Sequence, residues 1–223
     1  RGRVEAKEKS GFYVRSLSRS LLEQPAPVAQ VSWPCQVRVN DLAGNIITDL
    51  QDEEMLQLGA AIPSMALMPL KQLSRIMKSI PAGDLQRLFS NYDLCTGSPE
   101  LREVLSKRML GLACATTADD IVTTNGCLEA VSLCLRAVTS PGDTVLVESP
   151  VFHCFLQLIE DLNLYVLEVP ACPENGMDPR SFEKALDANP VTVCLLNSNF
   201  HNPLGSVMSR ENKKAIFNIA RKR

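Results

Sequence analysis

A run of apolar and β-branched residues, Val191-Thr192-Val193-Cys194-Leu195-Leu196, leads through a short polar segment into the turn Asn202-Pro203-Leu204-Gly205. A continuous run of this length, bounded by turn residues, is typical of a buried strand in a parallel sheet. The polar residues after it mark the carboxyl end of that strand, where open α/β sheets bind their ligands. Because Asn-Pro and Gly are also ordinary turn residues, the weight of the motif depends on the segments before it.

Strands and helices alternate before this stretch. Apolar, β-branched runs predict strands at 121–124, 144–147, 165–169 and 191–196. Helical spacing and capping residues predict helices that start at 69, 99 and 127, and further helices over 152–162, 181–186 and 210–219. This alternation predicts an α/β fold with a mostly parallel sheet and helices on both of its faces.

The composition is that of an ordinary globular protein. The 223 residues are 45% hydrophobic and carry a net charge of −2, which argues against a whole-chain affinity for nucleic acid or membranes. No apolar run approaches the roughly 20 residues that cross a bilayer. The start, Arg1-Gly2-Arg3-Val4-Glu5, has neither a hydrophobic signal core nor a Met, so we expect a piece of a longer protein.

The eight cysteines form no Cys-x-x-Cys pair, and most lie in apolar stretches. We therefore expect buried, reduced thiols in a cytoplasmic protein, and not disulfides or a zinc site. His153 and His201 lack the spacing of metal ligands, and for both a packed or solvated structural role is favoured over catalysis.

The chain divides into three parts by pattern. Residues 1–15 read as two short strands around a Lys-Glu-Lys-Ser-Gly turn, which predicts a basic β-hairpin. Residues 16–53 are polar, are interrupted by prolines and show no sustained period, so they predict a linker that crosses a surface. Residues 54–223 hold the alternating strands and helices of the α/β domain.

Three predicted strand ends carry residues suited to a cofactor. Asn125-Gly126-Cys127 opens directly into a helix, where free amides and the positive helix end favour a phosphate, although a plain tight turn is the alternative. Phe152 can present its ring face to a planar ligand, with core packing as the alternative. Asn202 supplies an amide donor. Together the three ends indicate a planar, phosphorylated cofactor.

Several segments resemble the class I/II aminotransferases, which are pyridoxal-phosphate enzymes of fold type I. The similar segments occur in that family's order: Thr123-Thr124-Asn125-Gly126-Cys127-Leu128-Glu129-Ala130, Pro141-Gly142-Asp143-Thr144-Val145, Glu148-Ser149-Pro150-Val151-Phe152 and Asn202-Pro203-Leu204-Gly205. The resemblance implies that Gly126, Cys127 and Leu128 bind the phosphate of pyridoxal 5'-phosphate through backbone amides. It also implies that Phe152 stacks on the pyridine ring and that Asn202 binds the phenolic oxygen.

Tyr92, followed by Gly97 and Leu101-Arg102, is similar to another segment of that family. The resemblance implies that Tyr92 reaches the cofactor phosphate of a neighbouring subunit, so we expect a homodimer. Gly59 matches a segment near the substrate carboxylate. The family's Schiff-base lysine has no counterpart here, because Lys213 and Lys214 follow the Asn202 turn too closely. We therefore expect this stretch of chain alone to be catalytically inert.

The hairpin resembles the wing of a GntR-type winged helix, and a winged helix linked to an aminotransferase-like domain is the arrangement of MocR-type transcriptional regulators. This resemblance implies that Arg1, Arg3, Lys7 and Lys9 contact DNA, chiefly its phosphates. It also implies a small-molecule amine or amino-acid effector. Two alternatives stay open: a pyridoxal-phosphate-dependent aminotransferase of amino-acid metabolism, and an α/β domain without a ligand.

Overall fold

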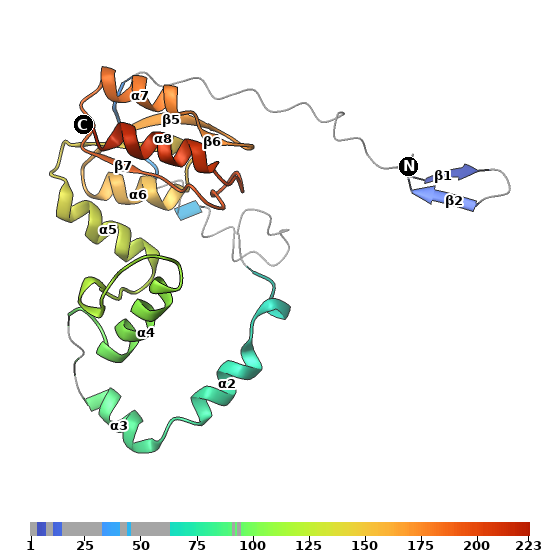
Figure 1. Ribbon diagram of the computed structural model, residues 1–223, viewed down its shortest axis with the longest axis vertical. Helices are drawn as coiled ribbons and strands as arrows, with labels where there is room; N and C mark the ends of the chain where they lie inside the picture. The colour runs from blue at the N-terminus through green and yellow to red at the C-terminus, as the bar shows by residue number, and fades with distance from the viewer. Residues whose placement is uncertain are drawn as a thin grey trace.

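The computed structural model describes residues 4–7, 11–14, 33–40, 44–45, 63–90, 92 and 95–223. Its centre is a mixed sheet with the order β3 (Cys35–Gln36), β5 (Tyr165–Cys172), β4 (Thr144–Ser149) and β7 (Val193–Leu195). Strand β4 is parallel to both β5 and β7, whereas β3 and the short β6 (Gly176–Met177) pair antiparallel with β5. Figure 1 shows helices on both sides of this sheet. The predicted α/β fold is confirmed.

Alternate residues of β4 and β5 face two separate apolar cores. Leu146 and Leu167 share one face, which packs on Phe182 of α7 (Pro179–Ala188) and Ile216 of α8 (Arg210–Ala220). The opposite face carries Val145, Val147 and Val166, which pack on Leu135 of α5 (Cys127–Val138) and Ile159 of α6 (His153–Asp161). Both faces of β4 are buried, as its unbroken apolar run predicts.

Side-chain caps fix where several helices begin. Ser98 accepts a hydrogen bond from the Leu101 N–H (3.3 Å) and Pro99 is the first residue of α4 (Pro99–Leu110), as the sequence predicts. Helix α7 begins earlier than expected, because Asp178 and not Ser181 is its cap. The Asp178 carboxylate accepts from the Ser181 N–H at 3.0 Å.

The predicted strand at 121–124 is wrong. These residues follow the short 3-10 helix η3 (Ala118–Asp120) as an extended segment without a strand partner among the described residues. Their one ladder-like contact is to a loop, since the Thr123 N–H donates to the Thr96 carbonyl at 3.1 Å. A strand requires a neighbour as well as β-forming residues, and no neighbouring strand is described here.

The expectation of buried cysteines is wrong, because none of the eight is fully buried and only Cys35, Cys154 and Cys194 are half-buried. All eight thiols are free, and five are exposed: Cys95, Cys114, Cys127, Cys134 and Cys172. Cys134 illustrates the reason, because on α5 the core face is formed by Leu135 and Val131, and Cys134 lies off that face. A continuous apolar stretch places side chains all round a helix, and only the face that meets the core is buried.

The N-terminal hairpin forms as predicted, with β1 (Val4–Lys7) antiparallel to β2 (Gly11–Val14) and Val4 opposite Val14. Arg1, Arg3 and Lys9 lie outside the described residues, and Lys7 is the last residue of β1. Within the predicted linker, β3 joins the main sheet, so part of this segment docks on the α/β domain. The three-part division of the chain stays a prediction.

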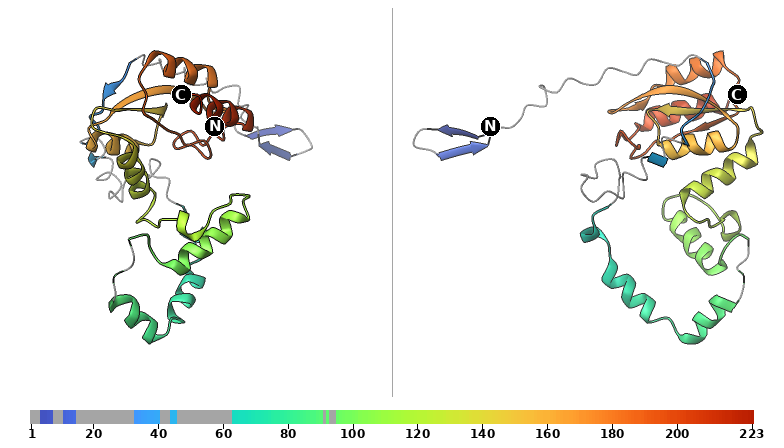
Figure 2. Two further views of the ribbon diagram at one scale, coloured as in Figure 1. Left: turned by 60° about the vertical axis from the view of Figure 1, so that its left-hand side comes forward. Right: turned by 180° about the vertical axis from the view of Figure 1, so that it is seen from behind.

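Helices α2 (Leu70–Lys78), which the sequence predicts, and α3 (Ala82–Ser90) lie before α4 in the chain. A 3-10 turn, η2 (Met65–Leu67), leads into them. Figure 2 shows both helices away from the sheet. Among the described residues, no helix combines the length and the apolar character that a membrane span requires.

Candidate functional site

The candidate site is the edge of the sheet where β4 and β7 end. The two strands are parallel neighbours, so the segments that follow them leave from the same edge. Strand β4 runs into Ser149-Pro150, and β7 runs into the turn at Asn202-Pro203. Both of these X-Pro peptide bonds are cis. The structure thus brings Phe152 and Asn202 to the ends of adjacent strands.

Phe152 caps the start of α6 and is half-buried. Its ring meets the rings of His153 (centroids 4.9 Å apart, 66° between planes) and Phe155 (5.5 Å, 83°) edge to face. Such contacts hold an aromatic ring in place without covering it by stacking. The geometry is therefore compatible with a ring that stacks on a planar ligand.

The turn that carries Asn202 is closed by backbone hydrogen bonds. The His201 N–H donates to the Ser206 carbonyl (2.9 Å), and the Met208 N–H donates to the Ser198 carbonyl (2.9 Å). Asn202 itself is half-buried, and among the described residues its side-chain amide has no hydrogen-bond partner. The fixed turn and the free amide are what a ligand-binding asparagine requires.

The start of α5 is open and carries no side-chain cap. Gly126 has φ +91°, and a Cβ placed there would meet no atom within 4 Å. No side chain caps the first amides of the helix, and both Cys127 and Leu128 are exposed. The Glu129 carboxylate instead accepts from the Asn125 N–H. Free N–H groups at a helix N-terminus suit a phosphate.

The predicted phosphate site, Gly126 to Leu128 (the cradle), is not joined to the strand ends by a hydrogen bond within the described residues. Figure 1 shows α5 running from beside α4 up to the sheet, so the start of this helix lies on the α4 side. The segment with the Tyr92 motif is tied to this cradle: besides the Thr123–Thr96 bond, a Cβ on Gly97 would lie 1.7 Å from Thr123 Oγ1. Tyr92 is fully exposed, and Gly59 lies outside the described residues.

Sequence reasoning missed one pair of residues at this edge. Glu148 and His201 are 2% and 3% exposed, and His201 Nε2 lies 3.5 Å from Glu148 Oε2. The packed role predicted for His201 is therefore what the structure shows, whereas Glu148 drew no attention beyond its place in a motif. The signal was a glutamate within an otherwise buried strand, because carboxylates are rarely buried without a partner.

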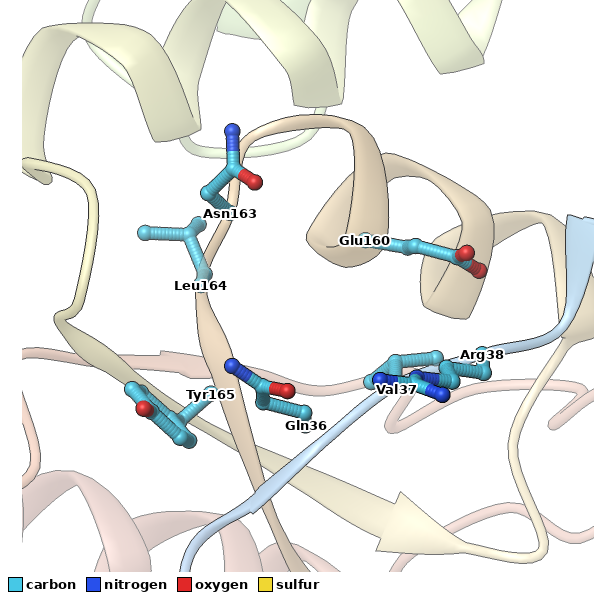
Figure 3. A pocket seen from close by; sticks show the side chains of 7 residues that line it. All are labelled: Gln36, Val37, Arg38, Glu160, Asn163, Leu164 and Tyr165. Carbon is cyan, nitrogen blue, oxygen red and sulfur yellow. The ribbon is translucent and has the colours of Figure 1, made fainter.

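A polar pocket of about 220 Å³ lies at the other end of the sheet, where β5 begins (Figure 3). Glu160 of α6 faces the segment that follows β3 and accepts hydrogen bonds from the N–H groups of Val39 (2.6 Å) and Asn40 (3.1 Å). Its carboxylate thus holds this part of the predicted linker against α6. The pocket is remote from the predicted cofactor residues and is not part of the candidate site.

Comparison with known proteins shows which family has this fold. Residues 53–223 match the model of the family Aminotransferase class I and II. The chain belongs to this family. Its fold is that of solved aminotransferases: it superposes on a Pyrococcus horikoshii kynurenine aminotransferase with a TM-score of 0.68 and 25% identity, covering 83% of this chain and 46% of that one. An archaeal alanine:glyoxylate aminotransferase gives 0.67 and 27%, covering 82% and 46%.

The curated relatives are of two kinds. Two uncharacterized HTH-type transcriptional regulators of Escherichia coli, YjiR and YdcR, are 31% and 33% identical to this chain, over 98% and 96% of its length. Bovine tyrosine aminotransferase is 35% identical over 46% of the chain and 23% of its own length. The chain spans about half the length of the regulators that it matches, 46% and 45%.

The predicted family and fold are thereby confirmed. The class I/II aminotransferases use pyridoxal phosphate, so the predicted cofactor is confirmed for the family. The residues of this chain fit it: the open helix start at Gly126 suits its phosphate, the ring of Phe152 suits its pyridine face, and the free amide of Asn202 suits its phenolic oxygen. The individual residue roles stay predictions.

Proposed function

We propose that this chain is the pyridoxal-phosphate-binding, aminotransferase-like effector domain of a DNA-binding transcriptional regulator of the GntR/MocR type. One observation carries the proposal: similarity to YjiR and YdcR covers 98% and 96% of the chain, whereas the family match begins at residue 53. The similarity therefore includes the hairpin and the linker. Those segments are not needed to build the cofactor site.

Each group of residues has a separate task in this proposal. The amides of Gly126, Cys127 and Leu128 hold the phosphate at the start of α5, where the helix dipole favours negative charge. Phe152 fixes the plane of the ring, and Asn202 donates to its phenolic oxygen. When bound, the cofactor supplies an electron sink for substrate carbanions. The chain's own residues supply binding and orientation.

The partners follow from the same resemblance. Tyr92, which is fully exposed here, reaches the cofactor phosphate of a second subunit in a homodimer. The effector is a small-molecule amine or amino acid, and Gly59 lies near the carboxylate when the effector is an amino acid. Arg1, Arg3, Lys7 and Lys9 contact DNA phosphates from the wing. We place the protein in the cytoplasm, where DNA and reduced thiols are both found in bacteria.

A gel-shift experiment tests the regulatory part of the proposal. The full-length protein is incubated with its own upstream DNA and with unrelated DNA of equal length. We expect a sequence-preferring complex that weakens as salt is raised, because phosphate contacts release counterions. Equal binding of both DNAs, or no binding, would contradict a regulator and favour an aminotransferase of amino-acid metabolism.

An absorbance spectrum tests the cofactor part. The full-length protein is expected to show a visible absorbance band that is absent after the cofactor is removed and that returns on addition of pyridoxal 5'-phosphate. The variant Asn202→Ala should bind about tenfold more weakly, the change expected for one lost hydrogen bond. A colourless protein that gains no band with added cofactor would show that the α/β domain has no such ligand.

A further inference from the structure

A buried acid and a buried histidine meet beneath the turn that carries Asn202. Glu148 is the next-to-last residue of β4, on the sheet face shared with Val169, and His201 lies in the turn after β7. The Nε2–Oε2 distance of 3.5 Å is longer than a good hydrogen bond. Glu148 Oε1 and His201 Nε2 both lack a hydrogen-bond partner among the described residues, although both are buried.

The hydrogen bonds around His201 determine which nitrogen faces the acid as a donor. The Leu204 N–H donates to His201 Nδ1 at 3.4 Å, so Nδ1 acts as an acceptor and the ring proton resides on Nε2. Nε2 is the atom that points towards Glu148. A buried carboxylate is costly unless it is paired and hydrogen-bonded, and a small inward movement of the turn would complete this pair.

Two routes lead from Glu148 to Asn202. The first passes through His201, which immediately precedes Asn202. The second passes through Asn197: its backbone N–H donates to Glu148 Oε2 (2.6 Å), and its side-chain oxygen accepts from the Asn202 N–H (3.3 Å) in the amide orientation that satisfies both side-chain atoms. The backbone of Asn202 is thus held on both sides by groups that Glu148 anchors.

We propose that Glu148 is a positioning residue for the cofactor, which it serves through His201 and Asn197 by fixing Asn202 at the phenolic oxygen. The inference rests on the proposed cofactor site. Glu148 touches no cofactor atom in this proposal. Glu148 therefore affects binding only while Asn202 contacts the phenolic oxygen. This dependence distinguishes a positioning role from a general contribution to folding.

A double-mutant cycle on the full-length protein tests the inference. The Kd for pyridoxal 5'-phosphate is measured by absorbance titration for the wild type, Glu148→Gln, Asn202→Ala and the double variant. We expect each single change to weaken binding about tenfold and the double change to weaken it no further than either single one. Glu168→Gln is the matched control, because Glu168 is a half-buried glutamate of β5 that pairs with Val147 on the opposite face of the sheet. It should change the Kd less than twofold.

A cofactor analogue adds an independent measurement. 3-Deoxypyridoxal 5'-phosphate lacks the phenolic oxygen, so the wild type and Glu148→Gln should bind it equally. Additive effects in the cycle, or an equal loss of affinity for the analogue, would overturn the positioning role. If Glu148→Gln fails to fold, Glu148→Asp keeps the charge but withdraws it from His201, and the same comparison applies. Failure of the wild type to bind pyridoxal 5'-phosphate would instead refute the proposed function.

Discussion

The sheet and the two helices that precede α4 use similar residues with opposite results. Leu146 in the sheet and Phe182 on the adjoining α7 are completely buried, and helices cover both faces of the sheet. In α2 and α3 no residue is buried, and large apolar side chains such as Ile76 and Phe89 remain exposed. Local sequence signals are enough to form a helix, but burial depends on a partner.

The difference concerns stability as well as shape. Buried apolar area is the main favourable contribution to folding, so the sheet region supplies most of the free energy of unfolding. Helices α2 and α3 contribute little within the described part of the chain. The predictions below measure how far the two regions differ.

The largest difference should appear when a phenylalanine is truncated in each region. Phe182→Ala leaves a cavity between α7 and the sheet and should lower the free energy of unfolding by about 3–5 kcal/mol. Phe89 is 87% exposed, so Phe89→Ala should change it by less than about 0.5 kcal/mol. Urea unfolding of the full-length protein, followed by circular dichroism, measures both. A comparable loss for Phe89→Ala would show that α3 is covered there.

Cysteine reactivity should next separate the sheet from the exposed segments on either side of α4. Burial raises the pKa of the Cys194 thiol on β7 to about 11, and because the thiolate is the reactive form, its fraction at pH 8 falls about a hundredfold below that of an ordinary thiol. Cys95 and Cys114 are exposed and should be labelled by iodoacetamide first. Peptide mass spectrometry after timed labelling identifies each site. Labelling of Cys194 as fast as Cys95 at pH 8 would contradict its burial.

These contrasts explain what the sequence could predict. The strands β4, β5 and β7 could be predicted because continuous apolar runs and turn residues are local signals. The strand predicted at 121–124 is not formed, and β3 was not predicted. Strand pairing depends on whether another strand lies alongside in the fold, which local sequence does not show. The Glu148–His201 contact could not be predicted for the same reason. A glutamate in a buried strand indicates that it has a partner, but the sequence does not show that the partner is His201.

Among the glycines, the strongest effect is expected at Gly97. Its φ is +89°, and a Cβ would collide with Thr123 Oγ1, so Gly97→Ala combines backbone strain with a steric clash. The free energy of unfolding should fall by about 1–3 kcal/mol. The change should also weaken cofactor binding, because Thr123 lies just before the helix start at Gly126. An unchanged midpoint of urea unfolding would show that the loops at 96–97 and 123 are not packed together.

Substitution of Gly83 in α3 should have the smallest effect, and unlike Gly97→Ala it should raise the free energy of unfolding. It lies in the first turn of a regular helix, and a Cβ placed there would meet no atom within 4 Å. Alanine restricts the unfolded chain more than glycine does, so Gly83→Ala should raise the free energy of unfolding by about 0.5–1 kcal/mol if α3 unfolds together with the sheet. If α3 frays independently, the global midpoint will not move, and only the hydrogen exchange of the α3 amides will slow. A loss of stability would instead mean that another surface packs closely against Gly83, because only a contact outside the described residues leaves no room for the added methyl group.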